Sequence, residues 1–175
     1  MEICILDAGR RDDLHLPNQP FELFGRMIPS CRDGVWSYTE RLFDEGERGA
    51  MCFPDEDYDF DAMSVDCTFL GAYENGECIG LAILQETGFR YWYLYDLKVN
   101  RDRRRGGVGR ALIERACALA RERGYLGIRT VAQDNNLAAC RFYLKNGFEI
   151  GGFDNRGYRG TRQEDKADIY FYLDV

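Results

Sequence analysis

The chain of 175 residues has few of the features that mark metal-binding, membrane or secreted proteins. It holds one histidine, and its seven cysteines include no C-x-x-C pair, so we expect no metal site. We interpret the cysteines as reduced thiols of a cytoplasmic protein. No stretch approaches the ~20 apolar residues of a membrane helix, and the N-terminus lacks the basic start and apolar run of a signal peptide. We therefore expect neither membrane insertion nor export.

Charge is distributed unevenly along the chain, whose formal net charge is −7. Residues 1–100 hold 20 Asp/Glu against 8 Lys/Arg, whereas residues 101–175 hold 10 against 15. This asymmetry predicts a cationic partner for the first part and an anionic partner for the second, with uneven surface charge of no function as the alternative. Nucleic acid is not expected, because the total charge is acidic and the basic cluster is confined to one turn.

Hydrophobic patterning predicts one domain, since the sequence shows neither an internal repeat nor a linker. The clearest signal is Asn75-Gly76, which is typical of a tight turn between strands at 67–73 and 78–86. The acidic segment 44–66 has few aliphatic residues, and we expect a mobile surface loop there, or an acidic rim that attracts a cationic substrate. Asp134 or Asn135 is the expected N-cap of a helix that starts at 137. The other expected elements are strands at 3–6, 89–99, 125–131, 148–153 and 168–173, a hairpin within 21–43, and a helix at 108–123.

The stretch Tyr91–Leu112 has the order of an anion-binding turn: an aromatic strand, four arginines, three glycines and a helix start. Unpaired amides of the first helical turn and the helix dipole favour a phosphate there. A dinucleotide-binding turn requires glycine where Leu112 stands, and a nucleoside-triphosphate loop requires Lys-Ser/Thr where the chain has Arg110. Both of these ligand classes are therefore disfavoured.

Two spaced motifs point to a third class of ligand. Arg104-x-x-Gly107-x-Gly109 follows a strand that ends at Val99, and the pattern N-x-x-A-x-x-F-Y-x-K-x-G-F runs from Asn136 to Phe148. Together they resemble the GCN5-related N-acetyltransferase (GNAT) superfamily over about residues 65–175. The resemblance implies an α+β fold with a mixed, mostly antiparallel central sheet and helices on both faces, and acetyl-CoA as co-substrate. Residues 1–64 would be the family-specific part of a single 1–175 domain.

A narrower likeness covers most of the chain. Pro17-x-x-Pro20-Phe21-Glu22, the segment from Gln133 to Asn136, and Gly147–Gly151 resemble streptothricin acetyltransferases. This group acetylates a primary amine on the β-lysine portion of a cationic antibiotic. The resemblance thus implies a small cationic amine as substrate. It leaves the oligomeric state open, with a homodimer as one option.

The resemblance also assigns cofactor contacts. Backbone amides of the glycine turn would hold the CoA pyrophosphate, and the end of the preceding strand would pair with the pantetheine arm as an added strand does. Asn136 would hydrogen-bond pantetheine amides, although a helix-capping role is equally compatible with its position. The implied contact residues are Leu97, Lys98, Val99, Arg104, Arg105, Gly106, Gly107, Val108, Gly109, Arg110, Asn136 and Ala139.

Catalytic roles follow from the same resemblance. Tyr143 matches the family's general acid, which protonates the leaving thiolate. Asp96 is our first choice for the base that acts on the amine, with three other carboxylates left open. Relatives frequently carry Glu-Asp where this chain has Tyr95-Asp96. The alternative bases are Glu40, Glu86 and Asp134.

The predicted function is acetyl transfer from acetyl-CoA to an amine of streptothricin. One alternative keeps this chemistry with another acceptor, such as a polyamine, a protein N-terminus or a lysine side chain. The other is a CoA-binding sensor without catalysis.

Overall fold

The computed structural model describes all residues 1–175, which fold into two compact units. The first unit comprises Met1–Gln19, Cys52–Ile128 and Asp174–Val175, and the second comprises Pro20–Met51 and Arg129–Leu173. Both are discontinuous, because the chain leaves the first unit after Gln19 and returns to it at Cys52. The assignment of 1–175 to one domain stays a prediction.

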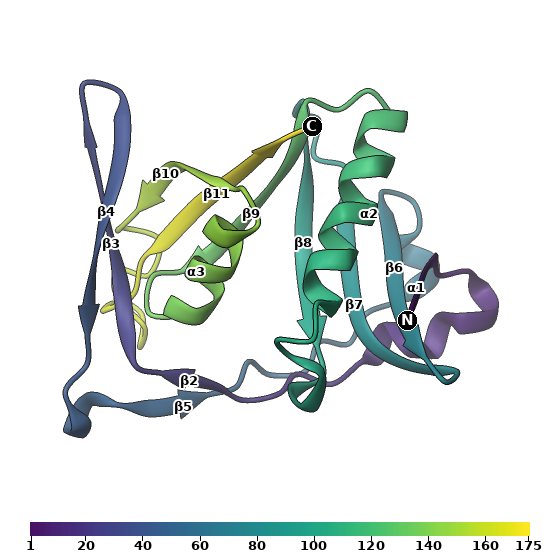
Figure 1. Cartoon of the computed structure of the whole chain (residues 1–175), viewed down its shortest axis with the longest axis horizontal. Helices are drawn as coiled ribbons and strands as arrows, with labels where there is room; N and C mark the ends of the chain where they lie inside the picture. The colour runs from purple at the N-terminus through teal and green to yellow at the C-terminus, as the bar shows by residue number, and fades with distance from the viewer. The chain divides into compact units, whose positions relative to one another are not determined.

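An antiparallel sheet forms the centre of the first unit, with the strand order β1-β6-β7-β8 (Figure 1). The predicted tight turn between β6 and β7 is confirmed, since Asn75 and Gly76 have φ values of 52° and 84°. These values suit asparagine and glycine, which adopt positive φ at low cost. The strands are β1 (Glu2–Ile5), β6 (Cys67–Glu74), β7 (Glu77–Gln85) and β8 (Tyr91–Val99).

Helices cover both faces of this sheet, as the resemblance implied. Helix α2 (Val108–Glu122) packs on one face, where Gly80 of β7 leaves room for the side chains of Val108 and Leu112. The opposite face carries the 3-10 helix η1 (Ala8–His15) and the short helix α1 (Phe60–Met63). The core on that face includes Leu6, Leu14, Tyr58, Phe69, Leu81 and Ile83.

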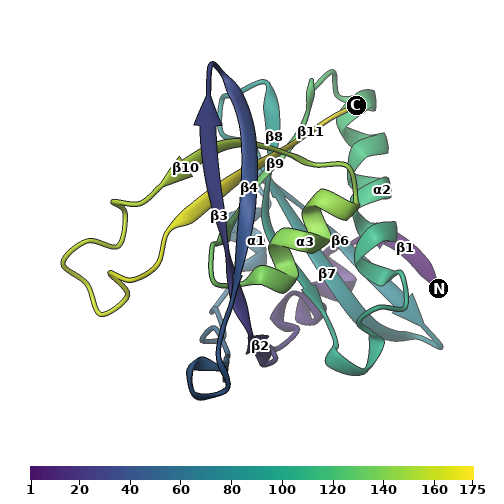
Figure 2. The ribbon, with the colours of Figure 1, turned by 60° about the vertical axis from the view of Figure 1, so that its left-hand side comes forward.

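Strands β9, β11 and β10, adjacent in that order, lie mostly in the second unit, together with helix α3. This unit also contains a long hairpin, β3–β4, which Figure 2 shows beside α3. The hairpin expected within 21–43 is confirmed, and Asp33 and Gly34 form its turn with positive φ. A further pair, β2–β5, was not anticipated. The bounds are β2 (Phe21–Leu23), β3 (Gly25–Arg32), β4 (Val35–Leu42), β5 (Gly49–Met51), β9 (Gly127–Gln133), α3 (Leu137–Lys145), β10 (Glu149–Asp154) and β11 (Asp168–Asp174).

The acidic segment 44–66 is not the structureless loop that its composition predicted. It contains a short 3-10 helix, η2 (Glu45–Glu47), as well as β5 and α1. Its carboxylates stabilise these elements: Asp44 and Glu47 form a capping box, and Asp59 accepts the amide proton of Ala62 at the start of α1. Composition failed here because capping depends on where each carboxylate stands in the segment, which a count of acidic residues does not show.

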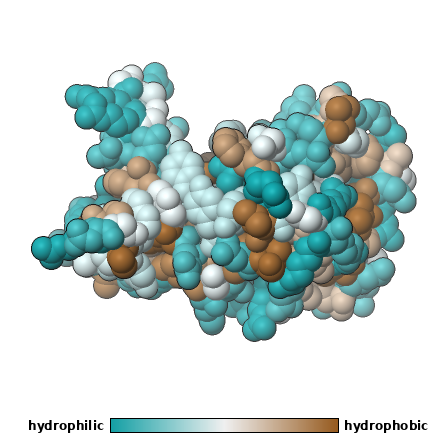
Figure 3. All heavy atoms as spheres, turned by 90° about the horizontal axis from the view of Figure 1, so that it is seen from above, coloured by the Kyte–Doolittle hydropathy of each residue, from teal (hydrophilic) through white to brown (hydrophobic).

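Hydrophilic residues cover much of the face in Figure 3, with apolar residues scattered among them in small groups. Such scattered apolar side chains are normal for a folded protein. None of the helices combines the length and the hydropathy that a membrane span requires.

Replacing Gly80 tests the close approach of α2 to the sheet. A Cβ at this position would lie 2.9 Å from Val108 Cγ1 and 3.2 Å from the Lys98 carbonyl oxygen. We expect Gly80→Val to lower the free energy of unfolding by about 1–3 kcal/mol through overpacking, measured by urea denaturation. Gly46→Val is the matched control, because nothing lies within 4 Å of a Cβ at Gly46. Equal stability of the two variants would contradict the packing argument.

Candidate active site

The glycine turn after β8 has the backbone shape of an anion cradle. Arg105 and Gly107 have φ values of 66° and 87°, and Gly107 is the N-cap of α2. A Cβ at Gly106 would lie only 3.1 Å from the Arg103 carbonyl oxygen. The left-handed conformation at Arg105 is one that glycine adopts more easily.

The start of α2 has no protein group in the place of an anion. Gly107 offers no side chain to cap the helix, and the first turn contains no acidic residue. The first backbone hydrogen bond of the helix runs from Ala111 N–H to the Gly107 carbonyl, at 3.0 Å. The amides of Val108, Gly109 and Arg110 come before this first bond and have no acceptor within the helix. Together with the helix dipole, they favour the binding of a phosphate group.

Arg104 holds this turn in place with its side chain. Its Nε donates to the Val99 carbonyl at 3.1 Å, and one terminal nitrogen donates to the Gln19 carbonyl at 3.1 Å. Burial lowers the pKa of this guanidinium. Gln19 also accepts the amide proton of Arg101 through Oε1, at 2.6 Å. Gln19 thus fixes the turn from a distant part of the chain, and no local sequence pattern indicated this.

A β-bulge in β8 decides which way Asp96 points. Ile83 of β7 pairs with Asp96 and Leu84 pairs with Leu94, so Tyr95 is the extra residue. Beyond the bulge the alternation is reversed, and Asp96 lies on the face of Ile83, away from α2. Without the bulge, Asp96 would lie on the α2 face with Leu94.

Asp96 is half-enclosed by polar groups from distant segments. Its Oδ2 accepts a hydrogen bond from the Tyr58 hydroxyl at 3.1 Å and lies 3.3 Å from the Lys98 ammonium. Lys98 also pairs with Glu56, at 2.6 Å. Burial raises the pKa of Asp96, while Lys98 and the Tyr58 hydrogen bond act in the opposite direction. Tyr58 and Glu56 were not expected here, because they belong to the segment predicted as a loop.

Helix α3 carries the second set of expected residues. Asn136 is its N-cap, and Asn136 Oδ1 accepts from the Ala139 amide at 3.2 Å. The expectation that Asp134 or Asn135 caps this helix is therefore wrong. The Asp134 carboxylate instead accepts from the Ala167 amide at 3.0 Å and pairs with Arg26. The capping role left open for Asn136 is confirmed, and its Nδ2 group has no protein partner.

Tyr143 lies in an aromatic environment within the second unit. Its ring contacts Phe142, Phe148 and Phe171, with centroid distances of 5.5, 5.2 and 5.4 Å. The residue is 8% exposed. These packed rings fix the orientation of the phenol, which a proton donor requires.

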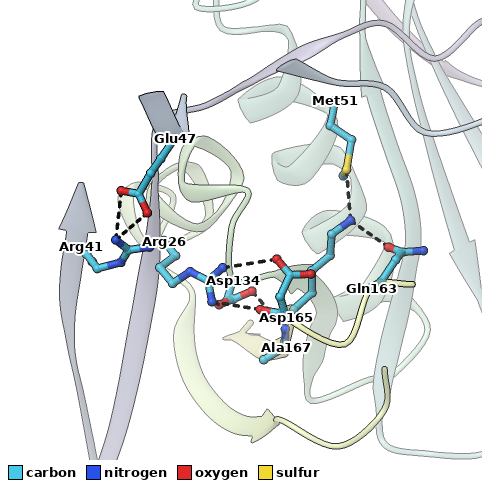
Figure 4. Close-up of polar contacts among 9 residues, drawn as sticks. Arg26, Arg41, Glu47, Met51, Asp134, Gln163, Asp165 and Ala167 are labelled. Carbon is cyan, nitrogen blue, oxygen red and sulfur yellow. Dashed lines mark hydrogen bonds and ion pairs between the residues drawn. The ribbon is translucent and has the colours of Figure 1, made fainter. Parts of the chain in front are cut away.

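The other candidate bases are engaged in ion pairs. Both oxygens of Glu40 accept from Arg141, and the hydrogen bond from Arg141 lowers the pKa of Glu40. Glu86 is exposed and lies 3.9 Å from Arg123. Asp134 is 4% exposed and holds Arg26 at 3.3 Å (Figure 4). Of the carboxylates considered, Asp96 combines partial burial with one oxygen, Oδ1, that accepts no hydrogen bond from the protein.

The comparisons with known proteins agree on one family. Residues 32–148 match the model of the acetyltransferase (GNAT) family. The chain is 35% identical to streptothricin acetyltransferase A of Bacillus subtilis (strain 168), over 91% of this chain and 92% of that protein. It is 31% identical to a streptothricin acetyltransferase of Escherichia coli, over 91% of this chain and 80% of that one.

A solved structure extends the match to the whole fold. A Bacillus anthracis str. Ames protein in complex with acetyl coenzyme A, provisionally assigned as a streptothricin acetyltransferase, superimposes with a TM-score of 0.86 at 30% identity. The match covers 100% of this chain and 99% of that chain.

Removing the cation that faces Asp134 tests whether this carboxylate is structural. Figure 4 shows Arg26 between Asp134 and Asp165, whereas Arg41 pairs with Glu47. We expect Arg26→Met to cost about 2–4 kcal/mol of unfolding free energy, because it leaves a buried carboxylate uncompensated. Arg41→Met is the control and should cost less than about 1 kcal/mol, since its pair is exposed. Similar losses in urea denaturation would refute the assignment.

Proposed function

Since the chain belongs to the acetyltransferase (GNAT) family and is an acetyl-CoA-dependent N-acetyltransferase, we propose that its acceptor is streptothricin. The acetyl group goes to a primary amine in the β-lysine portion of the antibiotic. The observation that carries this proposal is the 35% identity to a streptothricin acetyltransferase over 91% of the chain.

The glycine turn fits the pyrophosphate of CoA. In our proposal the amides from Arg105 to Arg110 bind it, and this role is supported by the positive φ of Arg105 and Gly107 and by the uncapped start of α2. The backbone of Leu97–Val99, at the end of β8, pairs with the pantetheine arm as an added strand does. The Nδ2 group of Asn136 donates to a pantetheine carbonyl while Oδ1 caps α3.

Acetyl-CoA supplies the acetyl group as a thioester. Amine acetylation requires that the acceptor loses a proton and that the leaving thiolate gains one. Asp96 takes the proton from the amine, and Tyr143 gives its phenolic proton to the thiolate. The new C–N bond replaces the C–S bond, and the protonated Asp96 and the phenolate return to their starting states through solvent.

The charge of the chain supports a cationic acceptor. The first hundred residues carry a net charge of −12, and Asp96 belongs to a cluster with two carboxylates and one ammonium group. Such a field raises the local concentration of a cation. Acetylation would then remove one positive charge from the antibiotic and weaken its electrostatic attraction to the acidic surface of the protein.

Turnover with purified streptothricin tests the proposal directly. We expect release of free CoA thiol from acetyl-CoA that depends on streptothricin, with one acetyl group added to the antibiotic by mass spectrometry. A panel of a polyamine, a lysine peptide and a peptide with a free N-terminus serves as the comparison. Absence of streptothricin acetylation by protein that binds acetyl-CoA would refute the proposed substrate.

Replacing the proposed acid tests its role in the chemical step. We expect Tyr143→Phe to lower kcat by roughly 10²-fold or more, with little change in the affinity for acetyl-CoA, because the ring and its packing remain. Tyr158→Phe is the control, since Tyr158, in the loop before β11, donates its hydroxyl to Asp168, the first residue of that strand. An unchanged kcat in Tyr143→Phe would remove this residue from the mechanism.

Arg104 offers a separate test of the cradle. We expect Arg104→Ala to weaken CoA binding by roughly tenfold, because two charge-assisted hydrogen bonds that hold the turn are lost. Isothermal titration with CoA measures the effect. Arg121→Ala, in the last turn of α2, is the control with the same loss of charge. If both variants bind CoA equally, Arg104 does not shape the cradle.

A further inference from the structure

Five side chains from three segments of the first unit form one connected polar network: Asn18, Glu56, Tyr58, Asp96 and Lys98. We propose that Tyr58 and the Glu56–Lys98 pair are positioning residues, which hold one oxygen of Asp96 so that the other faces the acceptor amine. This inference rests on the proposed function, in which Asp96 takes a proton from the amine.

The β-bulge at Tyr95 brings the members of the network to one face of the sheet. Asp96 pairs with Ile83 and Lys98 pairs with Leu81, so both side chains leave β8 on the side of these two residues. Leu81 and Ile83 belong to the same core cluster as Tyr58. The network is therefore a product of the bulge, since Asp96 would otherwise lie on the opposite face.

The contacts to Asp96 are asymmetric. The Tyr58 hydroxyl and the Lys98 ammonium both meet Oδ2, at 3.1 and 3.3 Å, and no protein group donates to Oδ1. The side chain is 18% exposed. A carboxylate fixed through one oxygen presents the other in a constant direction, which is the arrangement that a proton acceptor needs.

Lys98 is itself held in place, so that it can hold Asp96. Its side chain is 8% exposed, and its ammonium donates to Glu56 at 2.6 Å and to the Leu16 carbonyl at 3.4 Å. The ammonium also lies 5.2 Å from the centroid of the Tyr58 ring. The same Glu56 oxygen accepts from Asn18 Nδ2 at 2.9 Å. Together with Asp96, these groups fix the position of the Lys98 ammonium.

The neighbours of Asp96 act on its charge in opposite directions. Lys98 and the Tyr58 hydrogen bond favour the carboxylate and lower its pKa, whereas burial and the charge of Glu56 raise it. The ring of Tyr95, 6.2 Å from that of Tyr58, completes the titratable groups around the site. Removing Tyr58 or Glu56 should therefore move the pKa of Asp96 in opposite directions, whereas a loss of structure alone would not produce such a pair of shifts.

The network gives the acidic segment 44–66 a definite task. Glu56 and Tyr58 come from this segment, and Asn18 donates its backbone amide to the neighbouring Asp55 at 2.6 Å. The segment is bound to β8 by the partly buried hydrogen bond from Tyr58 to Asp96 and by the ion pair between Glu56 and Lys98. Its role in this proposal is to fix a catalytic carboxylate, in addition to any attraction of cations by its remaining charges.

Matched tyrosine variants provide the test. Tyr58→Phe and Tyr73→Phe each delete a buried hydroxyl that donates to an aspartate, to Asp96 and Asp13 respectively. Measured with acetyl-CoA and streptothricin, the acid limb of the kcat–pH profile should move up by roughly one pH unit in Tyr58→Phe and stay in place in Tyr73→Phe. In Glu56→Gln the limb should move down. Thermal unfolding of each variant records any general loss of stability.

A second measurement keeps the inference separate from the choice of acceptor. Titration of Asp96 by ¹³C NMR in the free protein, assigned with Asp96→Asn, should show the same opposite shifts in Tyr58→Phe and Glu56→Gln. Absence of these shifts, or equal kcat–pH profiles in Tyr58→Phe and Tyr73→Phe, would overturn the inference. If streptothricin is not acetylated, the proposed function fails, and the NMR titration still decides whether Tyr58 and Glu56 control Asp96.

Discussion

The single extra residue in β8 is the constraint on which the candidate chemistry depends. A strand shows its side chains alternately on two faces, and the bulge at Tyr95 shifts that alternation by one position. Asp96 and Lys98 consequently leave the α2 face and meet Tyr58 and Glu56 on the other. The same strand still ends in the turn that leads to the start of α2. The bulge thus sends Asp96 to one face of β8, and the anion cradle lies in the turn that follows the same strand.

The two parts of the site use different chemistry for different tasks. The cradle depends on backbone conformation, because amides at a helix start bind phosphate regardless of side-chain identity. This explains why Arg105 is tolerated at a φ of 66°, a value that favours glycine. The environment of Asp96 depends instead on side chains, and on a cation held between two carboxylates. Buried ionic groups of this kind contribute little to stability but fix geometry, which suits a role in orientation.

Segments far apart in the sequence meet at both parts. Gln19 binds the glycine turn through Arg101 and Arg104, and Glu56 and Tyr58 reach β8 from the acidic segment. The carboxylates of that segment are mostly engaged as caps, ion-pair partners or hydrogen-bond acceptors. In the second unit, Asp134 likewise has a structural role, because it pairs with Arg26 and accepts a hydrogen bond from the Ala167 amide. These carboxylates therefore have structural roles, whatever attraction for a cation the remaining acidic residues provide.

The sequence by itself determined the family, the glycine turn before α2, the tight turn at Asn75-Gly76 and the main strands and helices, because each depends on local spacing, periodicity or residues with special backbone preferences. It also marked Tyr143, Asp96 and Asn136 through motifs whose roles remain predictions. Only the tertiary structure decided the bulge at Tyr95, the cap at Asn136 and the network around Asp96. These features arise from the register between strands and from competition among polar groups for hydrogen-bond partners. Both depend on residues far apart in the sequence, so no single stretch predicts them.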